Sequence, residues 1–272
     1  MTSAVTNQAY GDAAEKLAAE TAASTGAQLA VIADEILTVA GLLRGQPRLR
    51  RALTDPSRPA EDRSGLFRDL LAGKAAEVTV DVLATLVAGR FGKPSDLLDA
   101  TERLGADALL TSAQKDGTLA EVEDELFRFG QIAEGTPTLA VTLSDISAPL
   151  APRVKLVGDL LDGKALPVTV RLVQVALEGL GGRGFESSLS RLVELTAAKR
   201  DREVAYVKVA KPLSDAEETA LAAKLTTIYG REVSLKVDVD PALIGGVSVR
   251  VGSDLYDGTI LRRLNAAKQA FA

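Results

Sequence analysis

The sequence predicts a mainly α-helical protein with a small α+β module at its C-terminal end. Three observations support this fold class. A block of about forty residues occurs twice, apolar residues recur at intervals of three and four through both copies, and the interval changes to two after residue 201. Intervals of three and four mark one buried helix face, whereas an interval of two marks a strand. We therefore expect two tandem antiparallel helical bundles followed by a strand-helix-strand-strand-helix domain.

The internal repeat sets the expected domain organisation. Residues 53–92 align without a gap on residues 143–182, and 17 of these 40 positions are identical. Self-similarity at a fixed offset, here 90 residues, indicates a duplicated structural unit. We expect a first helical bundle over residues 1–105, a second over residues 106–200 and an α+β C-terminal domain over residues 201–272.

The sequence of each copy of the repeat predicts a bundle of short antiparallel helices. The apolar positions at helical spacing are Leu29, Ile32, Ile36, Val39 and Leu43 in the first copy, and Leu119, Val122, Leu126 and Phe129 in the second. Gly73 and Gly163 follow matching Leu-Leu pairs, where glycine closes a helix in the left-handed conformation. The Val-Thr-Val segments at 78–80 and 168–170 suit a strand by composition, but the apolar spacing around them favours a helix.

The last part of the chain predicts the α+β domain. A first strand is expected over residues 204–209, and a helix from the capping box of Ser214 and Glu217 to Gly230. The apolar face of that helix is expected to comprise Leu221, Leu225 and Ile228. A second strand over residues 233–239 precedes a turn at Asp240-Pro241, and a third strand over residues 247–251 is expected to pair antiparallel with the second. Residues 256–258 are expected to turn the chain into a final amphipathic helix.

Composition argues against several classes of function. The chain contains no His and no Cys, which removes the commonest general base and the thiolate metal ligands. The net charge is −5 and no basic face is apparent, so a nucleic-acid partner is not expected. Residues 1–17 lack the features of a signal or transit peptide, and no uncharged apolar stretch reaches 18 residues, so we expect no membrane span.

For two short motifs we prefer a structural explanation over a ligand-binding or catalytic one. The GxGxxG pattern at residues 179–184 follows a predicted helix and not a strand, so we interpret it as a loop between helices. The neighbouring carboxylates at 34–35 and 123–125 are expected to lie on solvated helix faces and not to perform acid–base chemistry.

One C-terminal block resembles a known family. The positions that carry the resemblance are Val239, Asp240, Leu243, Ile244, Gly245, Gly246, Val247, Val249, Arg250, Gly252, Asp257, Gly258, Arg263 and Leu264. This ungapped block is similar to the signature of the ATP synthase delta subunit family, which includes the mitochondrial oligomycin-sensitivity-conferring protein. The strand and helix of residues 204–230 and the segment from Ala9 to Ala18 also resemble that family.

The resemblance implies a non-enzymatic subunit of the peripheral stalk, or stator, of the F-type ATP synthase, without a cofactor or a metal. It implies that the helical part binds N-terminal helices of alpha subunits on top of the catalytic head. It further implies that the C-terminal domain binds the end of the b-type stalk subunit, so that rotor torque drives ATP synthesis. The expected location is peripheral, at the cytoplasmic face of the bacterial cell membrane.

The duplicated bundle departs from the usual member of the family and resembles the actinobacterial form. Our hypothesis is that the first copy binds the head through a groove lined by Tyr10, Ala13, Leu17, Leu83 and Leu86, while the second copy lengthens the link. The stalk is expected to contact Ile244, Val247, Leu261 and Leu264. Two alternatives stay open. One is a helical adaptor of another assembly with a delta-like C-terminal module. The other is an enzyme that uses carboxylate or tyrosine chemistry, whose sign would be a deep pocket holding carboxylates of raised pKa.

Overall fold

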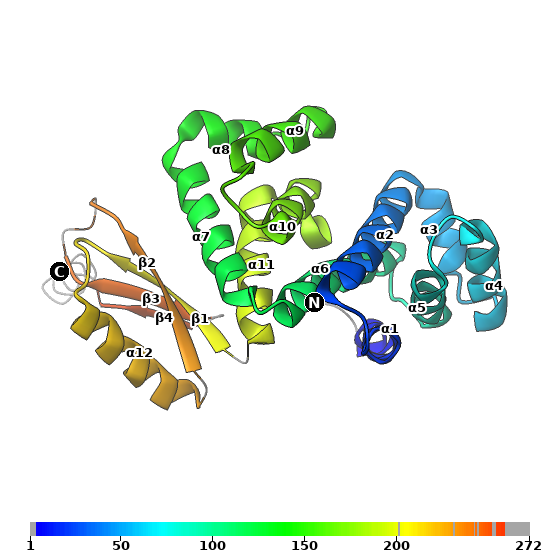
Figure 1. Ribbon diagram of the computed structural model, residues 1–272, viewed down its shortest axis with the longest axis horizontal. Helices are drawn as coiled ribbons and strands as arrows, with labels where there is room; N and C mark the ends of the chain where they lie inside the picture. The colour runs from blue at the N-terminus through cyan, green and yellow to red at the C-terminus, as the bar shows by residue number, and fades with distance from the viewer. Residues whose placement is uncertain are drawn as a thin grey trace, which may run out of the picture.

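The computed structural model describes residues 4–200, 202–230, 232–241, 243, 245–251 and 254–258. It is mainly helical, with a small sheet at the C-terminal end (Figure 1). The first repeat lies at one end of an elongated molecule, the second repeat in the middle and the sheet at the other end (Figure 1). This arrangement confirms the expected fold class.

The first repeat contains six helices. They are α1 (Ala4–Glu20), α2 (Gly26–Gly45), α3 (Pro47–Leu53), α4 (Ala60–Leu71), α5 (Glu77–Ala88) and α6 (Pro94–Lys115). The Val-Thr-Val segment lies in α5, which confirms the helical interpretation. Helix α2 is long and apolar enough to cross a membrane by length and composition, yet half of its most apolar window is buried within the protein. Packing in the bundle therefore accounts for its apolar character.

The second repeat continues with α7 (Leu119–Gly135), α8 (Pro137–Ser144), α9 (Leu150–Leu161), α10 (Pro167–Glu178), the 3₁₀ turn η1 (Leu180–Gly182) and α11 (Phe185–Lys199). Each of these helices begins near the position found 90 residues after its counterpart in the first repeat. Gly73 and Gly163 both adopt positive φ after α4 and α9, as predicted. The GxGxxG pattern forms the turn between α10 and α11, which confirms that it is a loop between helices.

Helix α6 belongs to both repeats. At the offset of 90 residues it is the counterpart of α1, and its own counterpart is α11. It therefore serves as the last helix of the first bundle and the first helix of the second. The position between residues 105 and 106, where the sequence suggested a division, falls within this continuous helix.

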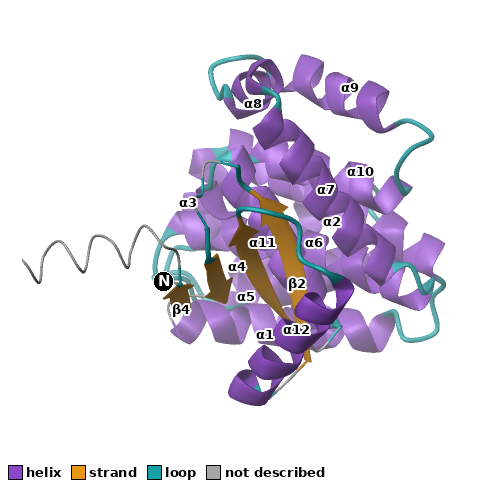
Figure 2. Cartoon of the chain, turned by 90° about the vertical axis from the view of Figure 1, so that its left-hand side faces the viewer, coloured by secondary structure: helices purple, strands orange, loops and turns teal. Residues whose placement is uncertain are grey.

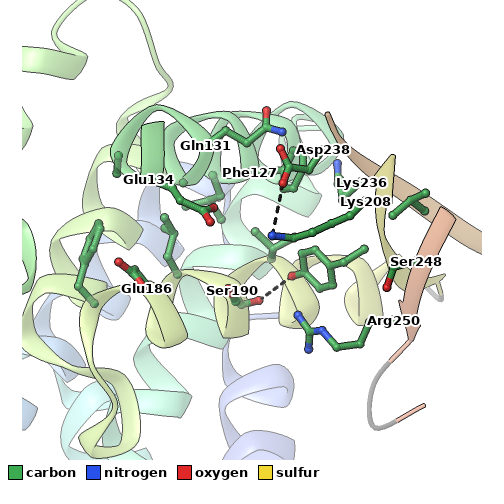
Figure 3. Close-up of a pocket in the computed structure, with 18 of the residues that line it drawn as sticks. Phe127, Gln131, Glu134, Glu186, Ser190, Lys208, Lys236, Asp238, Ser248 and Arg250 are labelled. Carbon is green, nitrogen blue, oxygen red and sulfur yellow. Dashed lines mark hydrogen bonds and ion pairs between the residues drawn. The ribbon is translucent and has the colours of Figure 1, made fainter. Parts of the chain in front are cut away.

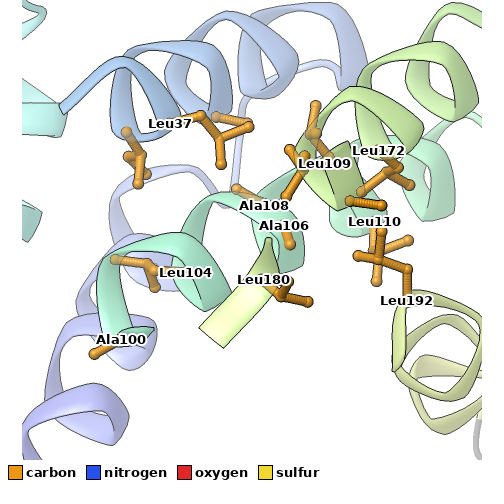
Figure 4. Packing of buried hydrophobic residues seen from close by; sticks show 14 of the residues in the cluster. Leu37, Ala100, Leu104, Ala106, Ala108, Leu109, Leu110, Leu172, Leu180 and Leu192 are labelled. Carbon is orange, nitrogen blue, oxygen red and sulfur yellow. The ribbon is translucent and has the colours of Figure 1, made fainter. Parts of the chain in front are cut away.

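One hydrophobic core runs through both repeats because α6 is buried on several sides (Figure 4). Leu104, Leu109 and Leu110 of α6 are at most 2% exposed, and they belong to the same cluster as Leu37 of α2 and Leu172 of α10. A helix that is apolar around most of its circumference is typical of a central position. The two bundles are thus one packed body.

The C-terminal module contains β1 (Arg202–Val209), α12 (Asp215–Tyr229), β2 (Glu232–Val239), β3 (Val247–Val251) and β4 (Asp254–Asp257). The strands lie in the order β2-β1-β3-β4, and α12 packs on one face of the sheet (Figures 1 and 2). The capping box of Ser214 and Glu217 and the left-handed Gly230 bound α12 as predicted. A second core cluster, which includes Ala205, Val207 and Leu225, holds this module together.

Three details of the module differ from the sequence-based expectations. Strand β3 pairs antiparallel with β1 and not with β2, which is parallel to β1. The chain crosses the end of β1 between β2 and β3, where the Asp240 amide donates a 2.8 Å hydrogen bond to the Val209 carbonyl. Residues 254–257, near the expected turn, form the fourth strand β4. Ile228 is 62% exposed, so Leu225 is the buried anchor of α12. The expected final helix lies outside the described residues.

Candidate partner-binding site

The residues expected to bind the head lie where α1 packs along α5. Ala13, Leu17, Leu83 and Leu86 are at most 5% exposed and belong to the common core. The two helices approach closely at Gly89, where a Cβ would overlap Ala9. In the structure these four side chains therefore lie together, and they form the packing between α1 and α5. A partner helix would touch the exposed residues beside them.

Tyr10 faces α6, away from α5. The Arg103 guanidinium lies 4.0 Å from the centroid of the Tyr10 ring, in a cation–π contact. Burial, reinforced by the nearby Asp107 carboxylate, raises the pKa of Tyr10 to about 12. The half-buried ring borders a cleft of 410 Å³ between α1, α6 and α11.

This cleft contains carboxylates, so the enzyme alternative can be examined there. Asp99 lines the cleft, and burial together with the neighbouring Asp96 carboxylate raises the pKa of Asp99. Asp96 accepts a 3.0 Å hydrogen bond from the Lys93 amide and thereby caps α6. The chain has no His or Cys to act beside Asp99, and the described residues hold no group of carboxylates able to bind a metal ion. Besides Asp99, the ionisable side chains that line the cleft are Tyr10, Lys93, Asp96, Arg103, Arg183 and Arg191.

Helix α2 is tied to the second repeat by ion pairs. Arg44 of α2 lies 2.8 Å from Glu102 of α6 and 2.5 Å from Glu178 of α10. Farther along α2, Asp34 lies 2.6 Å from Arg171 of α10. Burial raises the pKa of Glu102, while hydrogen bonds from the Gly181 amide and from Arg44 oppose that shift. Arg44 thus binds two helices of the second repeat at once.

Several of the carboxylates expected to be solvated have structural partners instead. Glu35 accepts hydrogen bonds from the Ala76 amide and the Thr79 hydroxyl, at the start of α5. Glu125 does the same for the Leu166 amide and the hydroxyl of Thr169, at the start of α10. The expectation was wrong because both carboxylates satisfy amide groups at helix N-termini. The threonines that share the offset of 90 residues were the available sequence signal.

The third carboxylate of interest, Glu123 of α7, joins the second repeat to the C-terminal module. Its side chain has no solvent exposure and lies 2.8 Å from Arg200 and 3.1 Å from Lys236 of β2. Lys236 is 5% exposed and also lies 2.6 Å from Asp124. This cluster was not predicted from sequence, because its members are separated by up to 113 residues. Each charge of the cluster needs an oppositely charged partner, because a buried charge without one has lost its hydration without compensation.

A cavity of 350 Å³ lies beside this cluster, between α7, α11 and the sheet (Figure 3). Its lining combines apolar side chains such as Phe127 with charged ones such as Lys208 and Arg250. The Tyr206 hydroxyl crosses from β1 to donate a 3.3 Å hydrogen bond to the Ser190 carbonyl of α11. Burial raises the pKa of Tyr206. The module is therefore held against the second repeat by both polar and apolar contacts.

The expected stalk contacts lie on or near the C-terminal module. Val247 begins β3, opposite Val209 of β1, and packs against the core of the module. Ile244, Leu261 and Leu264 lie outside the described residues.

Comparison with known proteins places the chain in a family. The model of the family "ATP synthase delta (OSCP) subunit" matches residues 101–271. The ATP synthase subunit delta of Salinispora arenicola is 56% identical over 100% of this chain and 99% of the relative, and that of Streptomyces griseus is 41% identical over 97% of both. A chain from a cryo-EM structure of the Toxoplasma gondii mitochondrial ATP synthase hexamer matches with a TM-score of 0.38 and 20% identity, over 61% of this chain and 95% of that one. Since full-length relatives and the family model agree, the protein belongs to the ATP synthase delta (OSCP) subunit family.

Proposed function

We propose that this subunit links the alpha/beta head of the F-type ATP synthase to its b-type peripheral stalk and has no catalytic role of its own. The observation that carries this proposal is the placement of the first repeat and the C-terminal module at opposite ends of an elongated molecule (Figure 1). The core that runs through both repeats, together with the buried Glu123 cluster, makes a continuous connection between these ends. These contacts support a link between the two ends.

The head contact is assigned to the first repeat and the stalk contact to the C-terminal module. N-terminal helices of alpha subunits would lie along α1 and α5, whose relative position Ala13, Leu17, Leu83 and Leu86 fix. The C-terminus of the b-type subunit would bind the module at Val247 and at Ile244, Leu261 and Leu264. The subunit would thereby sit peripherally at the cytoplasmic face of the bacterial cell membrane, held there by its partners.

Because the subunit would attach at two points, a modest affinity at each end is enough to hold the head to the stalk. Once one end is bound, the second binding event becomes intramolecular, with an effective concentration set by the connecting body. This concentration is high only if the two partners lie at the distance that the subunit spans. The head is then held still while the rotor turns.

Binding of the purified full-length subunit to isolated heads and to a soluble fragment of the b-type subunit tests this proposal. Sedimentation velocity should show a ternary complex that contains all three components. Binding of the head and the stalk fragment to the subunit only in competition, or binding of neither, would contradict a linking role.

A further inference from the structure

The sheet of the C-terminal module has two chemically different faces. Side chains alternate along each strand, and the apolar set, which includes Val207 and Val249, packs with α12. The opposite face is polar and comprises Tyr206 and Lys208 of β1, Lys236 and Asp238 of β2, and Ser248 and Arg250 of β3. A sheet face of this composition is typically turned to water. Here it is turned to α7 and α11 of the second repeat (Figure 3).

The helices present an apolar wall to this polar face. Leu126 of α7 and Leu189 and Val193 of α11 line the cavity and are at most 3% exposed, and Phe127 lies beside them. Between the two walls a volume of 350 Å³ stays open. Small-molecule sites in proteins have volumes of about 300–1,000 Å³ and combine apolar walls with a few polar groups. The cavity therefore has the size and the lining of a site for a small ligand.

The polar wall carries three cations, of which one has no carboxylate partner. Lys208 and Lys236 each form ion pairs with carboxylates. Arg250 instead contacts the ring of Tyr206, with its guanidinium 4.7 Å from the ring centroid, and it forms no ion pair with a carboxylate in the described part of the chain. An arginine that stacks on an aromatic ring keeps its N–H groups available to an anion. Arg250 is thus the group on this wall that can receive a negative charge.

Carboxylates at the other end of the cavity fix the orientation of a ligand. Glu134 of α7 and Glu186 of α11 also line the cavity, and both are exposed. Figure 3 shows them on the side away from Ser248 and Arg250. They repel an anion from that end, because like charges at short range raise the energy of both. An anionic group is therefore directed to Arg250.

We propose that the cavity between α7, α11 and the sheet binds a small amphiphilic anion, which places one carboxylate or sulfonate group on Arg250 and its apolar body against Phe127 and Leu189. The bond from the guanidinium to the anion is charge-assisted, and the apolar wall removes the body of the ligand from water. One wall belongs to the second repeat and the other to the module. The ligand contacts both only in this arrangement and stabilises it by mass action. The inference requires neither of the partner contacts proposed above.

Energy transfer tests the site on the full chain, which contains no tryptophan. Phe127→Trp places a single donor in the cavity wall, and Phe91→Trp, between α5 and α6 of the first repeat, is the matched control. The probe is anilinonaphthalene sulfonate, which has an apolar body and one sulfonate. We expect saturable transfer with one probe per chain in the Phe127→Trp variant and weak transfer in the Phe91→Trp variant. Equal transfer in the two variants, or none in Phe127→Trp, would overturn the proposal.

Calorimetric titration with the same probe tests the role of Arg250. Arg250→Gln should weaken binding about tenfold or more, since it removes a hydrogen bond to a charged group, and Arg250→Lys should retain more of the affinity because it keeps the charge. The matched control is Arg58→Gln, an exposed arginine of the first repeat, which should bind the probe as the unmodified chain does. Circular dichroism of each variant checks that the chain is folded. An affinity unchanged by Arg250→Gln, or an equal loss in Arg58→Gln, would place the probe elsewhere and contradict the site.

Discussion

At the scale of single residues, Glu123 is the most consequential charge in the described part of the chain. It is fully buried and forms ion pairs with Arg200 and Lys236, so its loss leaves the buried Lys236 with the 58% exposed Asp124 as its remaining ion-pair partner among the described residues. Removing one member of a buried ion pair costs more than the pair contributes, because the remaining charge stays desolvated. The polar part of the contact between the second repeat and the module is therefore weakened when this carboxylate is removed.

Glu123→Ala should lower the free energy of unfolding by about 3 kcal/mol. Urea denaturation followed by circular dichroism measures this change. The matched control is Lys155→Ala, which breaks the 75% and 63% exposed Lys155–Asp159 pair and should leave stability unaltered. Similar midpoints for Glu123→Ala and the unmodified chain would show that the buried cluster does not stabilise the protein.

The raised pKa of Tyr10 predicts a loss of stability in alkaline solution. Below pH 10 the phenol is protonated in both the folded and the unfolded chain, so its contribution is fully present. Between pH 10 and about 12 the unfolded chain ionises first, and stability falls. Tyr10→Phe should make this fall shallower in denaturation experiments over that interval. An unchanged slope, or a Tyr10 resonance that titrates near pH 10 by NMR, would contradict the burial of this ring.

Residue roles were only partly predictable from sequence. The buried positions of Leu17, Leu83 and Leu86 follow from helical spacing. The roles of Glu35 and Glu125 did not follow, because their partners lie 41 to 44 residues away on other helices. Charge on a helix face looks the same in a sequence whether it meets water or a neighbouring helix N-terminus.

At the scale of elements, Gly105 permits the close packing of α2 on α6. Gly105→Val should destabilise the protein by about 2 kcal/mol, since its Cβ would press on Leu37 and overpacking a core typically costs this much. The matched control is Gly65→Ala in α4, where no atom lies within 4 Å of the new Cβ. That change should raise stability slightly, because alanine favours the helix. Thermal unfolding of both variants tests the pair, and a stable Gly105→Val would show that α2 and α6 are less closely packed.

The order of strands was the element-scale feature that sequence did not determine. Alternating valines identified β1, β2 and β3, but alternation does not say which strands are neighbours. The segment between β2 and β3 is long enough to cross the end of β1, so β3 pairs with β1. Strand β4 has only four residues, all of them exposed or partly exposed, and thus gives no apolar alternation.

At the scale of the whole molecule, duplication has produced one longer packed body. The shared α6 and the continuous core place the first repeat at one end and the C-terminal module at the other. The offset of 90 residues revealed the duplication in the sequence. The sharing of one helix became visible only in the structure, because α6 is continuous across the expected boundary.

Proton-driven ATP synthesis in membrane vesicles stripped of this subunit tests the linking function most directly. Adding the full-length chain should restore both retention of the head on the membrane and ATP synthesis. Asp12 is an exposed carboxylate of α1, the helix proposed to contact the head, so Asp12→Lys should restore less of each at the same concentration. Glu121→Lys changes an exposed carboxylate of α7 and should match the unmodified chain. Synthesis that is fully coupled without the subunit, or heads that remain bound in its absence, would contradict a stator role.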